Sequence, residues 1–214
     1  MVVSRSRCFK YASRGEVDTE GRWSVFGQIY RRLSSVPVNA LRRTEQLWDT
    51  VFAGERAHDA GGPYRECWSA LCADFMSPHL PLLLPCPNNV GKVGVNQETF
   101  LVNPDCARSP VQMDMLVCLG KLMGIAARAK NFLDLYLAPM VWKMLVQQPV
   151  SLEDLRAMDV TGANQLQSYR ARRGMSEATW SSDYSDLFFA TTTRSSIGAT
   201  LLCLSPRRCA AFFN

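Results

Sequence analysis

Apolar residues recur at helical spacing along much of the chain. One stripe follows Ser24, a residue type that often caps a helix N-terminus, and Pro37 comes after it. The stripe consists of Val25, Phe26, Ile29, Tyr30 and Leu33. This pattern predicts a helix that begins near Ser24 and ends before Pro37.

Two further helices are predicted in the middle of the chain. Pro63 suits the first turn of a helix, and Ser109-Pro110 is a suitable start for another that continues to about Arg128. The inward face of the first is expected to consist of Trp68, Leu71, Cys72 and Phe75. Gly120 and Gly124 lie four residues apart on the second, and we expect them to allow close packing of a neighbouring helix.

Two shorter helices follow. Pro139 opens the first, whose apolar residues are Val141, Trp142 and Leu145, and we expect Trp142 to be a core residue. Ser151 is predicted to cap the second, with Asp154 completing a capping box.

Strand patterns are brief. Over residues 48–53, Trp48, Thr50 and Phe52 alternate with the residues between them, which suits a short strand that ends at Gly54. Phe100 to Val102 predicts another extended piece. Asn88 to Gly94 is expected to form a loop. The predicted fold class is therefore mainly α with short β-strands (α+β).

The chain divides by composition into three parts. Residues 1–23 are polar and basic without clear periodicity, and we expect a poorly ordered leader. Residues 24–189 carry the predicted helices and strands. Residues 190–214 contain no Asp or Glu and no clean period, so they are predicted to be a divergent tail of doubtful structure.

Overall composition indicates a soluble globular chain. Its 214 residues are 47% hydrophobic and 20% charged, close to the average of folded domains. A net charge of +5 is too weak to indicate nucleic-acid binding. No apolar run approaches the roughly 18 residues of a membrane span, and the first residues lack the apolar core of a secretory signal. We expect a cytoplasmic location, with the nucleus as a further possibility, and neither a nucleic-acid nor a membrane partner.

The cysteine pattern argues against a metal site and against catalysis. The eight cysteines include no C-x-x-C pair, and the two histidines show no ligand spacing, so we expect no metal and no cofactor. Cys67, Cys72 and Cys118 fall at apolar helix positions and are predicted to be reduced core thiols. Cys8 and Cys209 have basic neighbours, but neither has a base or an orienting partner nearby in sequence, so we assign no catalytic residue.

A glycine turn precedes the helix that Pro63 starts. The chain contains no phosphate-binding glycine motif, and Gly61-Gly62 alone cannot cradle a phosphate, so the turn is interpreted as structural. Asp59 is expected to brace the turn. Glu66 is expected in the first turn of the helix, where the helix dipole favours a negative charge.

The segment WDTVFAGERAHDAGGPYRE, at residues 48–66, resembles the opening signature of HECT-type ubiquitin ligases. The preceding VFGQIYRRL is similar to the helix that comes before that signature, and five later blocks follow in the family's order. These blocks are PCPN (85–88), FLVNP (100–104), LGKLMGIAAR (119–128), LDLYLAPMVWKML (133–145) and SLEDLRAMD (151–159). The resemblance covers roughly Val25 to Phe189, and the residues of these blocks are most similar to those of the large HERC branch.

The resemblance implies the large subdomain of a HECT N-lobe. In such a two-lobed module, the N-lobe binds a ubiquitin-charged E2, and a C-lobe cysteine takes ubiquitin as a thioester before passing it to a substrate lysine. The family's Thr-Cys-Phe context is absent here, so no residue inherits the nucleophile role. The residues that carry over do so only as scaffold: Asp59, Gly61, Gly62, Pro63, Arg65 and Glu66.

The sequence therefore predicts part of an E3 ubiquitin-protein ligase. We expect it to lack the catalytic cysteine lobe and most of the E2-binding region, and to be inactive and to bind E2 poorly on its own. Two alternatives stay open: a non-catalytic protein-interaction module, and a truncated splice product.

Overall fold

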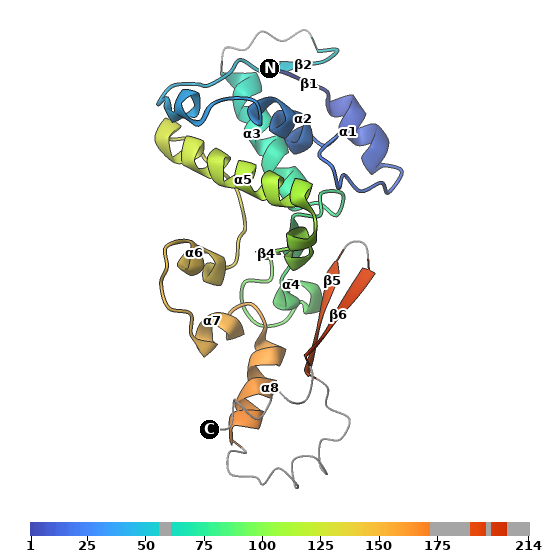
Figure 1. Ribbon diagram of the computed structural model, residues 1–214, viewed down its shortest axis with the longest axis vertical. Coiled ribbons are helices and arrows are strands. Elements are labelled where there is room, and N and C mark those ends of the chain that lie inside the picture. Colours follow the sequence, from blue (N-terminus) through green and yellow to red (C-terminus); the bar gives the residue numbers. More distant parts are fainter. Residues whose placement is uncertain (56–60, 172–188, 196–197, 205–214) are drawn as a thin grey trace. The chain divides into compact units, whose positions relative to one another are not determined.

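The computed structural model describes residues 1–55, 61–171, 189–195 and 198–204 (Figure 1). The chain forms two compact units. Unit 1 combines Met1–Pro85 with Phe100–Leu137, and unit 2 combines Cys86–Thr99 with Ala138–Asn214. Helices dominate and the strands are short, which confirms the predicted fold class.

Unit 1 is built around three helices. These are α2 (Val25–Leu33), α3 (Gly62–Phe75) and α5 (Pro110–Ala129), and α2 contacts both of the others (Figure 1). The fully buried side chains from these helices include Phe26, Ile29, Leu71, Phe75, Met115 and Leu122. The predicted inward face of α3 is confirmed, because Trp68, Leu71, Cys72 and Phe75 are all buried. Two 3-10 helices, η1 (Val38–Arg42) and η2 (Pro104–Arg108), pack against α5.

Polar groups hold the N-terminus of α2. Ser24 is the N-cap, as predicted, and its hydroxyl accepts a hydrogen bond from the Gly27 N–H at 2.9 Å. The carboxylate of Asp18 accepts hydrogen bonds from three backbone N–H groups, those of residues 22–24, and from the Ser24 hydroxyl. Asp74, from α3, accepts the N–H of Phe26 at 2.8 Å. Buried carboxylates thus satisfy N–H groups that a helix start leaves without partners.

Four short strands pair in two small sheets in unit 1. β1 (Val2–Val3) runs parallel to β2 (Val51–Phe52), and β3 (Leu83–Pro85) runs antiparallel to β4 (Phe100–Val102). The strand predicted at residues 48–53 is therefore shorter than expected, although its alternation holds: Thr50 and Phe52 are buried, and Val51 between them is exposed.

Residues 1–23 contain regular structure, where the sequence pattern predicts a poorly ordered leader. Besides β1, the segment forms α1 (Arg5–Ala12). No residue of α1 is fully buried, and its sequence has no continuous apolar stripe that could pack on a core. The helix is attached by polar contacts instead: the Ser4 N–H donates to the Gln28 side chain at 2.8 Å, and the Gln28 amide donates back to the Ser4 carbonyl at 3.1 Å. Such contacts leave no periodic signal in the sequence.

Helix α5 starts after Ser109 as predicted, but its glycines do not have the expected role. Gly120 and Gly124 are exposed, and no described atom lies within 4 Å of a Cβ built on either. The prediction that they receive a neighbouring helix is wrong.

By length and composition, α5 could cross a membrane, contrary to what the apolar runs of the sequence indicate. Its inward side chains, such as Met115 and Leu122, are fully buried in unit 1, which is the position of a core helix.

Unit 2 contains four helices within the described ranges, together with a hairpin. The helices are α4 (Pro87–Gly91), α6 (Pro139–Leu145), α7 (Leu152–Arg156) and α8 (Val160–Ala171). β5 (Phe189–Ser195) pairs antiparallel with β6 (Gly198–Leu204). Apart from Phe189, the hairpin lies within residues 190–214, the segment expected to have doubtful structure. Part of the loop predicted at Asn88 to Gly94 is helical in α4, which Pro87 starts because its fixed φ suits a first helical turn.

The capping box of α7 is confirmed and connects α7 to α6. The Ser151 hydroxyl accepts the Asp154 N–H, and the Asp154 carboxylate accepts the Ser151 N–H. The Lys143 ammonium lies 2.6 Å from the same carboxylate. The hydrogen bond from Lys143, followed by those from Ser151, lowers the pKa of Asp154 to about 2.

The apolar stripe of α6 is not part of a core. Trp142 is 43% exposed, and no residue of α6 is fully buried within the described ranges. The prediction that Trp142 is a core residue is therefore wrong. Helical spacing shows that a face is apolar, but it does not show that another element covers it.

Two helical glycines provide a test of the packing of unit 1. A Cβ on Gly27 would lie 2.5–2.7 Å from backbone atoms of Gly21, whereas one on Gly124 meets nothing within 4 Å. We expect Gly27→Ala to destabilise the chain by at least about 2 kcal/mol through overpacking. The matched control Gly124→Ala should be neutral or stabilise by up to about 1 kcal/mol through helix propensity. Urea unfolding followed by circular dichroism measures both. Equal midpoints for the two variants would contradict the packing of α2 described above.

Candidate functional site

At the glycine turn before α3, one of the two glycines adopts a backbone conformation that other residues rarely adopt. Gly61 has φ of +96°, in the left-handed region that favours glycine, and α3 begins at Gly62 with Pro63 in its first turn. The Arg65 N–H donates to the Gly61 carbonyl at 3.3 Å, and the Arg65 side chain is exposed. Asp59 lies outside the described residues, so its bracing role stays a prediction.

Arg5 of α1 connects the two sides of this turn. Its guanidinium donates to the Glu55 carboxylate, with Nε 3.0 Å from Oε1, and to the Glu66 carboxylate. It also lies over the Phe52 ring, 4.0 Å from the centroid. The hydrogen bonds that Arg5 donates to Glu55, and then those to Glu66, raise the pKa of Arg5. Arg5 thereby joins the end of β2 to the start of α3.

The position of Glu66 corrects one prediction. Because α3 begins at Gly62, the first helical turn contains no acidic residue, and Glu66 falls one turn later. The dipole argument for Glu66 is therefore wrong, and its carboxylate is paired with Arg5 instead. Sequence reasoning missed Arg5 because it lies 61 residues from Glu66, in a segment that carries no apolar pattern.

Aromatic rings support the turn from the protein interior. The Trp48 ring lies 5.3 Å from the Tyr64 ring and 5.7 Å from the Trp68 ring, centroid to centroid. The Asn131 side chain donates to the Tyr64 hydroxyl at 3.2 Å. Tyr64 and Trp68 thus anchor the start of α3 in the interior, and the exposed Glu66 is paired with Arg5.

Asn88, in the PCPN block, is the corresponding fixed point of unit 2. The side chain is fully buried; its amide donates to the carbonyls of Val95 and Arg156 at 3.0 and 3.3 Å, and its oxygen accepts the Val160 N–H at 2.9 Å. The Asn88 N–H also donates to the Met158 carbonyl. One side chain therefore joins α4, the following loop, the end of α7 and the start of α8.

The described cysteines are not activated nucleophiles. Among the described cysteines, Cys8 is half-buried, and the other five, which are Cys67, Cys72, Cys86, Cys106 and Cys118, are buried. The burial of Cys67, Cys72 and Cys118 agrees with the prediction that they are core thiols. Burial raises the pKa of the Cys72, Cys106 and Cys118 thiols to about 11. A reactive cysteine needs a lowered pKa and access to solvent, so these thiols lack both requirements.

Cys8 lies near the carboxylate of Asp74 and the imidazole of His79, but the three groups are not arranged as a catalytic triad. Its Sγ lies 3.7 Å from Asp74 Oδ1, and His79 Nε2 lies 3.1 Å from that same oxygen. In a catalytic triad the imidazole lies between the nucleophile and the acid, whereas here the carboxylate occupies the middle position. Burial and the Asp74 charge raise the pKa of Cys8 to about 11. The described groups therefore provide no base for this thiol.

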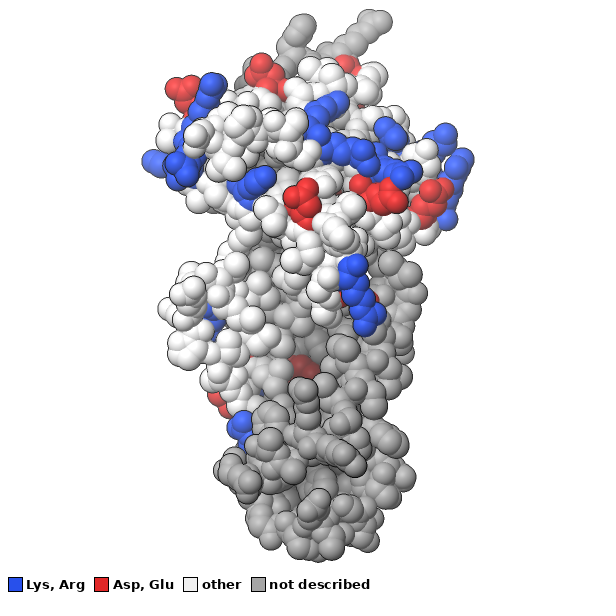
Figure 2. Space-filling view, in the orientation of Figure 1, with Lys and Arg blue, Asp and Glu red and all other residues white. Residues whose placement is uncertain are grey.

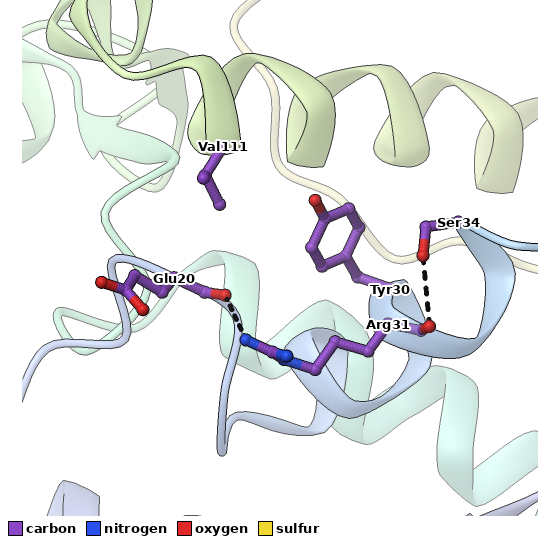
Figure 3. Close-up of a pocket in the computed structure, with 5 residues that line it drawn as sticks. All are labelled: Glu20, Tyr30, Arg31, Ser34 and Val111. Atoms are coloured by element: carbon purple, nitrogen blue, oxygen red, sulfur yellow. Dashed lines mark hydrogen bonds between the residues drawn. The ribbon is translucent and has the colours of Figure 1, made fainter.

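A surface pocket in unit 1 also lacks reactive groups. It is lined by Glu20, Tyr30, Arg31, Ser34 and Val111 (Figure 3). Arg31 donates to the carbonyls of Gly21 and Glu20, and the Tyr30 hydroxyl donates to Asp114 at 2.8 Å. Burial and this bond to Asp114 raise the pKa of Tyr30 to about 12. Polar groups that are already paired within the protein leave the pocket without convergent groups for a ligand.

Charged side chains form no single-sign field on the face of unit 1 that Figure 2 shows. Blue and red side chains are intermingled there. Arg22 pairs with Glu20, and Arg14 pairs with Glu16. This mixture does not resemble the basic surface that a nucleic-acid partner requires.

Comparison with known proteins identifies the family. Residues 69–206 match the family described as HECT-domain (ubiquitin-transferase). The match extends past Phe189, where the resemblance found in the sequence ends. Mouse E3 ubiquitin-protein ligase HERC2 is 36% identical over 157 residues, which are 73% of this chain and 3% of that protein. Human probable E3 ubiquitin-protein ligase HECTD4 is 32% identical over 159 residues, 69% of this chain and 4% of that protein. The chain thus spans a few per cent of the length of these relatives.

Asn88 should be critical for the stability of unit 2. In Asn88→Ala, the Val160 N–H and two carbonyls lose their partner in a buried position, so we expect a loss of about 3 kcal/mol of unfolding free energy. The matched control is Asn89→Ala, which removes a bond donated to the Thr99 carbonyl and an exposed bond accepted from Lys92, and which should cost less than about 1 kcal/mol. Hydrogen exchange of the Val160 amide and urea unfolding test this. Equal effects of the two variants would refute the role of Asn88.

Buried thiols should resist alkylation. A pKa of about 11 leaves about one thiol in 1,000 as thiolate at pH 8, whereas an unfolded cysteine is substantially ionised. We expect iodoacetamide to label Cys72, Cys106 and Cys118 at least about 100-fold more slowly in the folded chain than in urea. Peptide mapping by mass spectrometry gives each rate. Labelling of the native chain at the rate seen in urea would show that these sites are accessible and ionised.

Proposed function

This chain belongs to the HECT-domain (ubiquitin-transferase) family, and from that premise we propose that it supplies the scaffold of the N-lobe in an E3 ubiquitin-protein ligase. The observation that carries the proposal is the family match over residues 69–206. Two structural features support it. Arg5 joins Glu55 and Glu66, which lie on either side of the glycine turn, and Asn88 joins four segments of unit 2. Both resembling blocks are therefore tied to the rest of their units by side-chain hydrogen bonds.

The chemical role that fits these residues is positioning. Ubiquitin transfer by a thioester needs a thiolate that is exposed and activated. The described thiols have the opposite properties, since burial keeps five of them from solvent and raises the pKa of several. We therefore propose that the residues of this chain hold the geometry of the lobe and do not themselves carry ubiquitin.

The partners that we propose follow from the positioning role of this chain. An E2 and a protein substrate are the partners that the family implies, and we propose that this stretch alone binds a charged E2 poorly. A second candidate, a non-catalytic interaction module, is favoured by one observation: the exposed apolar residues of α6 and its C-terminal end, which are Trp142, Met144, Leu145 and Val146. A partner that binds this face would protect Trp142 from solvent.

A thioester assay tests the proposal directly. The chain is incubated with E1, ATP, ubiquitin and a panel of E2 enzymes, and the products are separated on non-reducing gels. We expect no reductant-sensitive ubiquitin adduct on the chain, because the described cysteines lack an activated thiolate. An intact HECT-domain ligase in a parallel reaction shows that the E1 and E2 are active.

The opposite outcome is equally clear. An adduct that reductant removes and that a single Cys→Ser substitution abolishes would falsify the scaffold role, and the position of that cysteine would identify the nucleophile. Fluorescence of Trp142, compared between the chain and its Trp142→Phe variant in the presence of each E2, tests the interaction candidate. A blue shift lost in the variant would favour binding at α6.

A further inference from the structure

Three potential metal ligands from different parts of unit 1 lie together. They are Cys8 on α1, Asp74 near the end of α3, and His79 in the segment that follows α3. The ligand atoms of all three lie within 4.8 Å of one another. Asp74 Oδ1 is the common neighbour, 3.7 Å from Cys8 Sγ and 3.1 Å from His79 Nε2.

These separations are close to those of ligands around zinc. With metal–sulfur bonds of about 2.3 Å and metal–nitrogen or metal–oxygen bonds of about 2.0 Å, tetrahedral geometry places sulfur about 3.5 Å from oxygen and nitrogen about 3.3 Å from oxygen. Both observed distances agree with this to within a few tenths of an ångström. The third distance, from Sγ to Nε2, is at most 4.8 Å and must shorten toward about 3.5 Å when a metal binds.

The carboxylate is oriented for this role by its surroundings. The Asp74 side chain is only 5% exposed, and its Oδ2 accepts the Phe26 N–H at 2.8 Å, which leaves Oδ1 facing the thiol and the imidazole. A hydrogen bond to the second oxygen is a typical device for orienting a metal-binding carboxylate. Among the described residues, Asp74 forms no ion pair with a lysine or an arginine. Its one potential ion-pair partner there is His79, which is charged only when protonated. A buried carboxylate without a fixed cation is costly, and a bound metal would supply the missing positive charge.

Aromatic side chains shield the same place. The Trp23 ring lies 5.4 Å from the His79 ring, and the Tyr11 ring stacks on Trp23 at 5.6 Å. The His79 side chain is 19% exposed. The neighbouring acid, Asp18, is already saturated by the N–H groups at the start of α2, so it adds negative potential without serving as a ligand. The cluster is thus largely buried and negatively charged, and Cys8 and His79 are each partly exposed to solvent.

We propose that Cys8, Asp74 and His79 bind one zinc-class divalent cation that fastens α1 to the end of α3. Binding converts the Cys8 thiol to a metal thiolate and releases its proton to solvent, and water completes the coordination. The site has a structural role: it links the N-terminal segment to the helix that starts at the glycine turn. It is independent of ubiquitin transfer and would be present whether or not the proposed function holds.

Cobalt(II) is a suitable probe because a thiolate ligand gives it a near-ultraviolet charge-transfer band and tetrahedral geometry gives it visible bands. The 214-residue chain, freed of metal by a chelator, is titrated with Co²⁺ and then with Zn²⁺. We expect both sets of bands to develop with one equivalent of Co²⁺ and to disappear when Zn²⁺ displaces it. Zn²⁺ should also raise the melting temperature of the chain and change the fluorescence of Trp23 beside His79.

Variants separate this site from adventitious thiol binding. Cys8→Ser should abolish the charge-transfer band, and His79→Gln should weaken Co²⁺ binding at least about tenfold. Asp74→Asn should weaken it similarly, but Asp74 also holds α2, so the other two variants decide the outcome, and their folding is checked by circular dichroism. His58→Gln, which replaces the chain's other histidine, and Cys118→Ala are the controls and should bind as the parent chain does. Failure to bind Co²⁺ at about 100 μM, or bands that survive in Cys8→Ser, would overturn the proposal.

Discussion

Two buried carboxylates hold the N-terminus of α2, and the packing of unit 1 depends on this contact. A helix start exposes N–H groups that must find partners when they are buried. Asp18 satisfies three such groups just before α2, and Asp74 satisfies the N–H of Phe26 within its first turn. Because α2 contacts β1, α3 and α5, fixing its start also fixes where Phe26 and Ile29 enter the core. The carboxylates therefore set the register of the hydrophobic packing.

Asp74 has a second contact that follows from the first. One carboxylate oxygen is used by α2, so the other faces Cys8 and His79. The negative charge of Asp74 interacts favourably with the dipole of α2. However, the Asp74 side chain is only 5% exposed, so the carboxylate loses most of its hydration. The protein meets that cost with a polar neighbourhood contributed by α1 and by the segment after α3. The same physical demand thus explains why the polar helix α1 lies beside the end of α3.

Much of the helical framework could be predicted from sequence because its signals are local. Ser24, Ser109 and Ser151 cap the helices that they are expected to cap, and the inward face of α3 follows its 3.6-residue period. The glycine turn can be recognised for the same reason, because glycine readily adopts the positive φ found at Gly61 and Pro63 suits the first turn of a helix. The errors concern what surrounds an element. Trp142 on α6 and the glycines Gly120 and Gly124 on α5 have helical spacing, yet all three are exposed. The spacing of residues along one helix does not show which elements pack against it.

Long-range polar contacts could not be predicted in this way. Arg5 reaches Glu55 and Glu66 across 50 and 61 residues, and Cys8 reaches Asp74 across 66, from a helix that has no apolar stripe. The expectation that this chain holds no metal rests on the spacing of cysteines and histidines along the sequence. Spacing is informative only when the ligands come from one local element, as in C-x-x-C turns. When helix packing brings the ligands together, their sequence separation carries no information, and the distances between side-chain atoms decide whether a cation fits.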